Sequence, residues 1–510
     1  MASDAHVEQE IKFAVGRTFK VPHFRDPVGR SVRHTKGVFR TAYFDTPDLR
    51  LWSRGITLRY RSATTGGPGT WTVKLPKADR RATLNRREIC WSTTRDEVPV
   101  EARSLLRGLI RRADLDRVVE MDTTRIPWTL HDHAGNEWAE LADDDVTVVG
   151  GPKDGVRYRQ IELERTGQST DDQAISAIAE VLQQAGGEVD DQPRLAKALG
   201  LAAARRHEPE AGALPTSTAA DVVRQALFDG LERLCDHDYR LRLRPDDPDN
   251  HDVHQARVAT RRLRSNLKTL GPLLDPIWVA HTVGELRWMG AILGAVRDAD
   301  VLAASLTPPG KSKLGRSGSD SLKELRTRLA AERADAVANL GEALGSQRYL
   351  DLLDRLHAGA SHPPLTHGSE NAPEPVRAVA VLPKLVRRRL RKLEKRVVAA
   401  GKSPTDEQLH RIRIAAKNLR YGAELSRTVV GKAAGKTAKP AENIQTVLGD
   451  YHDAAASIAW LTQAGATPRG SGVAAGVLIA EHARRQKKLA RKWRHQWTEL
   501  SRPGRRRWLA

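Results

Sequence analysis

Charged residues alternate with apolar residues in several short segments of the first third of the chain. In VEQEIKF, residues 7–13, Glu8, Glu10 and Lys12 fall on one face of an expected strand. Solvent-exposed strand faces usually mix Ser, Thr, Lys and Gln, whereas this face carries a carboxylate pair beside a cation. ITLRYR, WTVKL, RREI, TTRI and QIELER repeat the alternation and add these charged residues: Arg59, Arg61, Lys74, Arg86, Arg125, Glu162 and Glu164.

Half-exposed antiparallel strands with solvated polar faces would explain any one of these segments. The six together favour charged faces that meet inside a closed sheet, with the apolar faces outside. The amphipathic segments at residues 100–113 and 173–185 could cover those apolar faces. Carboxylates at i and i+2 hold hard divalent cations, while Arg and Lys bind phosphate oxygens. Such an interior predicts phosphoryl-transfer chemistry on an oligophosphate.

Five motifs occur in a fixed order between residues 5 and 200: E-x-E-x-K, YFDTPDLRLWSRGITLRYR, WTVKLP, AELADDDV and QIELER. In this order they resemble the CYTH family of triphosphate tunnel metalloenzymes. The resemblance implies an antiparallel eight-stranded β tunnel with flanking helices. It also implies hydrolysis of inorganic triphosphate or organic triphosphates with Mg²⁺ or Mn²⁺ as the cofactor.

The family's site residues can be carried over onto this sequence. Asp144 is preferred among three consecutive aspartates because it shares a face with Glu140, and Gln160 stands where family members often have an acid. Lys12 would be the catalytic residue, either as general base or as phosphate clamp. The metal ligands would be Glu8, Glu10, Asp144, Glu162 and Glu164. The triphosphate would be bound by Arg59, Arg61, Lys74, Arg86 and Arg125.

Long helical patterns rich in Ala, Leu and Arg follow residue 207. At 100° per residue, one stripe of the segment at residues 254–268 spans an arc of about 80°. A solvated helix face usually interleaves acids with its cations, and this stripe has none. Metal binding is disfavoured because no acid or second histidine lies at i+3 or i+4 of its histidine. The stripe consists of His254, Arg257, Arg261, Arg264 and Lys268.

A second stripe repeats the first, with His410, Arg413, Lys417 and Arg420 at the same offsets. LGAVRDADVL and LGDYHDAAAS then follow at matching distances, 44 residues from His254 to Asp298 and 43 from His410 to Asp453. This duplication predicts two four-helix bundles. The two aspartates would orient the arginines or act directly, and the histidines would make structural hydrogen bonds or contact a ligand.

The ordered motifs HQARVATRRLR, LGAVRDADVL, HRIRIAAKNLRY and LGDYHD resemble the CHAD domain, a helical family with conserved histidines, over residues 218–500. The resemblance implies binding of inorganic polyphosphate along both stripes. The segment at residues 383–396 carries eight basic residues against one Glu. It would widen this anion-binding surface or simply be solvated.

Length and composition limit the alternatives. The chain has 510 residues and a formal net charge of +21, which predicts an anionic partner. Nucleic acid is disfavoured because only 5% of residues are aromatic. Two cysteines, no signal-like N-terminus and no long apolar segment predict a cytoplasmic protein without a membrane span, with polyphosphate granules as an expected location. The oligomeric state stays open.

The expected fold class is α+β and multidomain. We expect the CYTH tunnel at residues 1–206, a linker at 207–218 and a CHAD domain at 219–505, with repeat halves at 219–357 and 375–500. The expected function is a metal-dependent inorganic triphosphatase, a hydrolase acting on phosphoanhydride bonds, coupled to a polyphosphate-binding domain. The alternative is a polyphosphate-binding adaptor with little or no catalysis.

Overall fold

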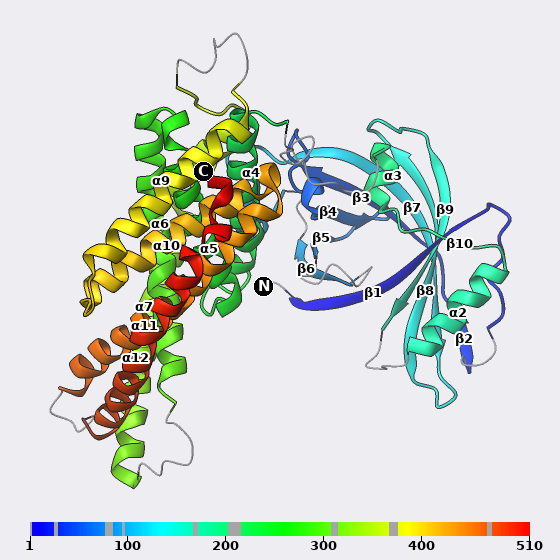
Figure 1. Ribbon diagram of the computed structural model, residues 1–510. Coiled ribbons are helices and arrows are strands. Elements are labelled where there is room, and N and C mark those ends of the chain that lie inside the picture. The colour runs from blue at the N-terminus through cyan, green and yellow to red at the C-terminus, as the bar shows by residue number, and fades with distance from the viewer. Residues whose placement is uncertain are drawn as a thin grey trace. The chain divides into compact units, whose positions relative to one another are not determined.

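Antiparallel strands form one sheet in the first part of the computed structural model, which is drawn in Figure 1. The structure describes residues 3–24, 29–76, 85–93, 97–166, 172–201, 216–307, 315–366, 376–466 and 472–509, without the side chains of residues 3–9, 85, 86, 172, 173 and 315. The chain divides into two compact units, residues 1–208 and 209–510. The predicted linker at 207–218 falls mainly outside the described residues.

The sheet closes on itself because β1 pairs with both β6 and β9. The closed circuit runs β1-β6-β5-β4-β3-β7-β8-β9 and returns to β1. Its strands are β1 (Ser3–Val15), β3 (Gly37–Asp45), β4 (Thr57–Ala63), β5 (Gly69–Pro76), β6 (Asn85–Thr93), β7 (Asp116–His131), β8 (Glu137–Val149) and β9 (Arg157–Arg165).

The circuit has the eight strands that were predicted, but the sheet as described has ten. The two additional strands are short: β2 (Arg30–Arg33) pairs with the end of β7, and β10 (Glu188–Val189) pairs with Phe13 and Ala14 of β1. Two to four residues are too few for a period-2 pattern to stand out in a sequence, so these strands were not predicted.

Apolar side chains cover the outside of the circuit. Phe13, Leu141 and Leu163 form a buried cluster with Ile178 and Leu182 of α2 (Asp172–Gln184). A second amphipathic helix, α1 (Val100–Ile110), buries its own apolar stripe. Truncating Phe13 to Ala would cost about 3–5 kcal/mol of folding free energy. The short helix α3 (Arg194–Leu199) follows β10.

Helices make up the second unit. The first half contains α4 (Ala219–Arg242), α5 (Asn250–Leu270), α6 (Pro276–Ser305), α7 (Gly315–Gly345) and α8 (Gln347–Ser361). The second half contains α9 (Ala378–Ala399), α10 (Asp406–Val430), α11 (Lys432–Gly465) and α12 (Gly472–Ser501).

The described first half thus has five helices where four were predicted. Ser346 starts the additional helix, because its hydroxyl accepts a hydrogen bond from the Tyr349 N–H at 3.2 Å. α9–α12 bury one core, to which Leu390, Leu419 and Trp493 contribute. α6, α7, α11 and α12 bury another, which joins the halves. Among the described helices, none combines the length and the apolar character needed to cross a bilayer.

Candidate functional site

A cavity of about 200 Å³ lies within the closed circuit of strands. Seven of the eight circuit strands and α3 contribute to its wall. Six cationic and four acidic side chains line it, so its surface favours an anion while retaining oxygen ligands. The lining residues are Glu10, Lys12, Tyr43, Thr57, Arg59, Arg61, Lys74, Glu88, Arg125, Glu162, Glu164, Pro193, Arg194 and Leu195.

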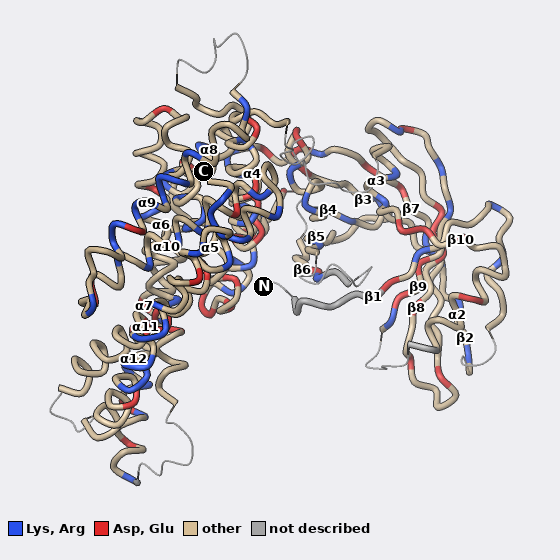
Figure 2. Tube along the Cα trace, viewed as in Figure 1, with Lys and Arg blue, Asp and Glu red and all other residues tan. Residues whose placement is uncertain are grey.

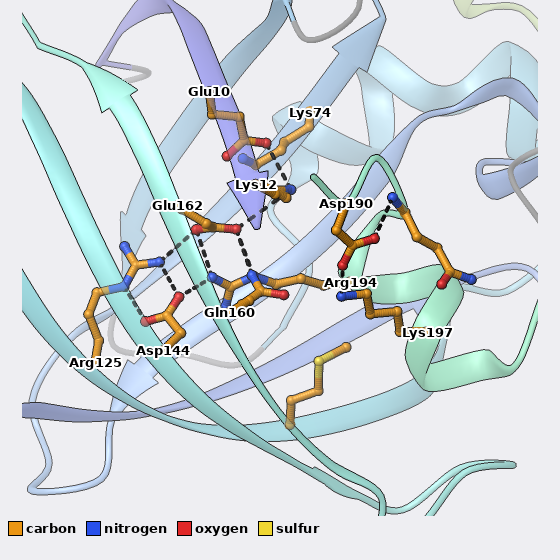
Figure 3. Close-up of polar contacts among 12 residues, drawn as sticks. Glu10, Lys12, Lys74, Arg125, Asp144, Gln160, Glu162, Asp190, Arg194 and Lys197 are labelled. Atoms are coloured by element: carbon orange, nitrogen blue, oxygen red, sulfur yellow. Dashed lines mark hydrogen bonds and ion pairs between the residues drawn. The ribbon is translucent and has the colours of Figure 1, made fainter. Parts of the chain in front are cut away.

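Glu162 is the central carboxylate of the cavity (Figure 3). It forms ion pairs with Arg194 at 2.7 Å, Arg125 at 2.9 Å and Lys12 at 3.6 Å. Burial acts to raise the pKa of Glu162, but these three cations outweigh it and hold that pKa well below its usual range. Glu162 therefore stays ionised and holds cations from β1, β7 and α3 together.

Lys12 points at two carboxylates, with Glu10 at 2.8 Å and Glu162 at 3.6 Å (Figure 3). Burial acts to lower the pKa of Lys12, but the charges of Glu162 and Glu10 raise it above its ordinary value. A lysine with a raised pKa keeps its proton at neutral pH. This environment suits a phosphate clamp better than a general base.

Asp144 is fully buried beside the cavity rather than in its lining. It lies opposite Arg125 on β7 and Gln160 on β9. Both Arg125 donor nitrogens reach the Asp144 carboxylate at 2.8 Å, and Arg194 donates to it as well. The predicted metal ligand is thus engaged by two guanidinium groups.

Arg61 differs from the other cations of the cavity. Its one hydrogen bond within the described residues goes to the Thr41 hydroxyl at 3.3 Å, and no carboxylate there pairs with it. Burial, followed by the charges of Arg59, Arg125 and Arg194, lowers the pKa of Arg61 to about 9. Lys74 in contrast pairs with Glu88, which also lies 3.9 Å from Arg59.

The donor set fits a divalent cation. Glu10 and Glu164 lie directly opposite each other on β1 and β9 and both line the cavity. Like charges at directly opposite positions repel, Lys12 already compensates Glu10 in part at 2.8 Å, and the carboxylate oxygens of such a pair suit Mg²⁺ or Mn²⁺. Within the described side chains no group of three such ligands is already arranged for a metal. The side chains of Glu8 and Arg86 lie outside that description.

Arg194 was missed by the sequence analysis, as was the wall position Tyr43; Thr57 and Glu88 lie on the predicted charged faces of ITLRYR and RREI but were not assigned a role. Arg194 sits in a six-residue helix directly after Pro193, where neither strand nor helix periodicity assigns a face. It is nevertheless one of the most deeply buried cations of the chain, with 6% of its surface exposed. The available signal was an isolated Arg beside Pro, which is too common to identify a site.

The two stripes of the helical unit lie side by side on α5 and α10. Ser265 donates to Asn418 across the two helices at 3.1 Å, and Arg262 pairs with Glu424 at 2.8 Å. Figure 2 shows the basic positions of α5 next to those of α10. We call the following set the arginine cluster: His254, Arg257, Arg261, Arg264, Lys268, His410, Arg413 and Lys417.

Like charges crowd in the arginine cluster. Burial lowers the pKa of Arg257, Arg264 and Arg413, and neighbouring cations add to this effect; Asp298 opposes it at Arg257 and Asp453 opposes it at Arg413. Lys417 is affected most among the lysines: burial, then Arg261, Arg413, Arg264 and Lys268, lower the pKa of Lys417 to about 7. An anion bound at the cluster would relieve this repulsion.

Several buried donors in the cluster point to the same conclusion. The Nε atoms of Arg257, Arg261 and Arg413, and Nδ1 of His410, have no hydrogen-bond partner among the described residues. Buried polar atoms are normally satisfied, so a ligand that accepts hydrogen bonds would complete them. Phosphate oxygens are suitable acceptors.

Two of the guanidinium groups lie next to repeat-related glycines, at a distance at which a Cβ would be in ordinary van der Waals contact. Arg257 Nε lies 3.5 Å from the place where a Cβ of Gly294 would be, and Arg413 Nε lies 3.6 Å from that of Gly449. Asp298, four residues after the first glycine, pairs with Arg257 at 3.3 Å. In both halves the motif LGxxxD thus places a glycine next to one arginine of the stripe; its aspartate pairs with Arg257 in the first half and acts on the charge of Arg413 in the second.

Arg420 departs from its repeat counterpart Arg264. Its guanidinium pairs with Glu424 at 2.7 Å and with Glu442 at 2.9 Å, which raises its pKa despite burial. The predicted polyphosphate contact at Arg420 is therefore already neutralised. His410 packs against His452, with ring centroids 4.7 Å apart, and burial lowers the pKa of both rings.

Comparisons with known proteins agree with this architecture. The CYTH domain model matches residues 6–193 and the CHAD domain model matches residues 225–462. Two uncharacterized proteins from two strains of Mycobacterium tuberculosis are each 31% identical to the chain over 493 residues, which covers 90% of this chain and 88% of theirs.

Solved structures resemble separate parts of the chain. PptA from Streptomyces chartreusis is 22% identical, with a TM-score of 0.45 over 55% of this chain and 100% of its own. The CHAD domain from Ricinus communis is also 22% identical, with a TM-score of 0.44 over 58% and 96%. A putative adenylyl cyclase from Hippeastrum, described as having a dominant triphosphatase activity, is 13% identical, with a TM-score of 0.24 over 38% and 96%.

The family matches place the charged cavity and the arginine cluster in separate domains. CYTH domains are tunnel metalloenzymes that use divalent metal ions. Because the full-length relatives align across both units, the order of the two domains is a shared feature. The chain therefore belongs to the family of proteins in which a CYTH domain is followed by a CHAD domain.

Proposed function

We propose that the tunnel hydrolyses inorganic triphosphate or a related short polyphosphate with Mg²⁺ or Mn²⁺, and that the helical unit binds polyphosphate. The observation that carries the proposal is Arg61, a part-buried guanidinium that lines the cavity and whose charge is opposed by the neighbouring cations Arg59, Arg125 and Arg194. An oligophosphate entering the cavity would supply the missing negative charge.

The residues of the cavity divide into two groups by position. Arg59, Arg61 and Lys74 come from β4 and β5, whereas Lys12, Arg125 and Arg194 surround Glu162. The first group would hold one part of the oligophosphate and the second would stabilise charge that develops on the phosphoryl group in transfer. Lys12, held protonated, would donate to a phosphate oxygen.

Glu10 and Glu164, together with Glu8, would hold the divalent cation. When bound, the metal would polarise phosphate oxygens and lower the pKa of a coordinated water. Glu162 would mainly position Arg125, Arg194 and Lys12, because its carboxylate is already shared among them.

Phosphate release tests the catalytic part. The full chain would be assayed with triphosphate, ATP and long-chain polyphosphate, with Mg²⁺, with Mn²⁺ and with EDTA. We expect metal-dependent release from triphosphate, reduced at least about 100-fold by Glu10→Gln. Glu188→Gln, an exposed change on β10, is the matched control and should keep full activity. No metal-dependent release from any of the three substrates would overturn the proposal.

A polyphosphate-binding adaptor with little catalysis is the second candidate. Gln160 replaces an acid, and Asp144 is held by Arg125 and Arg194. Both observations reduce the number of carboxylates available to a metal. Tight triphosphate binding without release, at every metal concentration, would favour this candidate over hydrolysis.

Polyphosphate binding by the arginine cluster is tested separately. Arg257→Glu together with Arg413→Glu should abolish polyphosphate binding by the full chain while leaving triphosphate hydrolysis intact. Duplex DNA at the same phosphate concentration serves as the competing ligand, and equal affinity for DNA would contradict polyphosphate selectivity. The exposed pair Arg316→Glu and Lys323→Glu is the control for lost net charge.

A further inference from the structure

The outer helices of the second half carry cations that the arginine cluster does not include. On α9, the exposed residues Lys384, Arg388, Arg391 and Lys395 follow one another at steps of four, three and four. At 100° and 1.5 Å per residue they fall within an arc of about 60° and extend over about 16 Å. We call this straight line of charges the α9 row.

An equivalent row lies on α12. Arg484, Lys488, Arg491 and His495 are all exposed and follow the same steps of four, three and four. Figure 2 shows basic positions recurring along both helices. α9 and α12 share a core through Leu393 and Trp493, so both rows belong to one bundle.

The outer helices of the first half can be compared in charge with their equivalents in the second half. α4 precedes α5 as α9 precedes α10, and α7 follows α6 as α12 follows α11. α9 has eight Lys and Arg against one acid and α12 has seven against two, whereas α4 has four against five and α7 has five against five. The surplus of positive charge is specific to the outer helices of the second half.

Among the described residues, none of the eight row members forms an ion pair with a carboxylate. Two of the three acids on the two helices pair with arginines outside the rows, Glu394 with Arg506 and Glu499 with Arg502, while Glu481 lies one turn before Arg484. Like charges at i and i+4 destabilise a helix. An external polyanion would remove that repulsion.

The surroundings of the rows select the class of polyanion. No large hydrophobic side chain is exposed between residues 384 and 395 or between 484 and 495, so neither row presents an apolar face for insertion into a membrane. Trp493 is fully buried, so the only aromatic ring on the α12 row is the imidazole of His495, and the α9 row has none. The rows therefore favour a polyanion that is recognised mainly by its charge.

We propose that the α9 and α12 rows bind a further length of the same polyphosphate chain that the arginine cluster holds. This inference rests on the proposed polyphosphate binding of the helical unit. Once one segment of a long polymer is bound at the cluster, the remainder is present at high effective concentration around the same bundle. A longer chain can contact the cluster and more of the row positions at once, so the rows make affinity depend on chain length.

Two triple variants of the full chain test the rows: Lys384→Gln/Arg388→Gln/Arg391→Gln and Arg484→Gln/Lys488→Gln/Arg491→Gln. Each should weaken long-chain polyphosphate binding about tenfold at moderate salt. Each should also reduce the slope of log affinity against log salt by about 2–3, because three phosphate contacts are lost. Affinity for short chains and the rate of triphosphate hydrolysis should not change.

The matched control is Arg316→Gln/Lys323→Gln/Arg326→Gln on α7, which removes the same charge from the equivalent helix. Long-chain affinity and salt slope equal to the wild type in both test variants would overturn the inference, as would an equal loss in the α7 control. A wild type that binds no polyphosphate would instead overturn the proposed function of the helical unit. Loss of duplex DNA binding with polyphosphate binding intact would also refute the assignment.

Discussion

The tunnel and the arginine cluster both concentrate cationic side chains, but they neutralise them differently. In the tunnel, Lys12, Arg125 and Arg194 are held by carboxylates, and their pKa values are raised above the ordinary range. In the cluster, burial first and neighbouring cations next lower the pKa values of Arg413 and Lys417, and burial lowers the pKa of Arg257 even though Asp298 pairs with it. Internal carboxylates thus stabilise the cations of the tunnel, whereas burial and neighbouring cations destabilise those of the cluster.

This difference fits two different tasks. A catalytic cavity needs cations at fixed positions before the substrate arrives, and internal carboxylates provide that order. A binding surface gains most affinity when its own charges repel one another until an external anion neutralises them. Arg61 is the exception in the tunnel, since it shares the lowered pKa of the cluster.

The largest effect is expected from Glu162→Gln, which removes the carboxylate shared by three buried cations. Activity should fall by more than about 100-fold and the tunnel domain should lose about 3–5 kcal/mol of stability. Phosphate release and thermal unfolding would measure the two effects. Glu137→Gln, exposed at the start of β8, is the control. Unchanged thermal unfolding would contradict the central role of Glu162.

Arg61→Gln should weaken substrate binding without lowering the stability of the tunnel domain. Loss of charged hydrogen bonds to the substrate should raise KM for triphosphate about 10- to 100-fold. The melting temperature should stay the same or rise, because a buried cation among cations is removed. Arg125→Gln should lower both activity and stability, whereas the exposed control Arg157→Gln should change neither. A lower melting temperature for Arg61→Gln would contradict this account.

Lys417 makes the cluster sensitive to pH. Its folded pKa of about 7 lies below the ordinary 10.5, so the unfolded chain binds more protons between these values. Without ligand, Lys417 therefore does not destabilise the folded state above pH 10.5, where the lysine is neutral in both states. As the pH falls towards 7, the unfolded chain takes up a proton that the folded chain does not, and the folding free energy becomes less favourable.

Bound polyphosphate should raise the pKa of Lys417 again, because the anion stabilises the charged form of the lysine. Binding should take up a proton above pH 7, and affinity should weaken by up to about tenfold per pH unit between pH 7 and 9. Calorimetry in two buffers with different ionisation enthalpies would measure the uptake. Lys417→Arg should abolish the slope, and the exposed Lys402→Arg should keep it. A slope retained in Lys417→Arg would assign the proton to another group.

The smallest predicted effect is a difference in polyphosphate affinity between variants at equivalent positions of the two stripes. Arg264→Gln should weaken polyphosphate binding several-fold, as expected for one charged hydrogen bond. Arg420→Gln, at the equivalent repeat position, should weaken it less than about twofold because Glu424 and Glu442 already neutralise Arg420. Fluorescence titration with labelled polyphosphate would resolve both. Equal losses would show that the carboxylates release Arg420 when the ligand binds.

The fold class could be predicted because it depends on local periodicity. Alternation with period 2 identified β1, β4, β5, β7 and β9, and the prediction of an antiparallel sheet with flanking helices before a helical domain is confirmed. The same alternation was sufficient to place Lys12, Arg59 and Glu162 in one cavity. Once the sheet closes, every inward face meets the others.

Pairings within the sites could not be predicted, because they depend on long-range register. Asp144 was assigned to the metal set from its face alone, but its partners Arg125 and Arg194 are 19 and 50 positions away. Arg420 matches its stripe in spacing, yet Glu442 on the next helix neutralises it. A sequence pattern assigns a face to a side chain, but tertiary packing assigns its partner.

The position of Arg194 has a practical consequence for dividing this protein into fragments. The CYTH match ends at residue 193, one position before the buried arginine that pairs with Glu162 and Asp144. A fragment that ends at that border would keep both carboxylates in the interior and discard one of their counterions, so poor folding of the fragment would say nothing about catalysis. An informative tunnel fragment has to extend through α3 to at least Leu201.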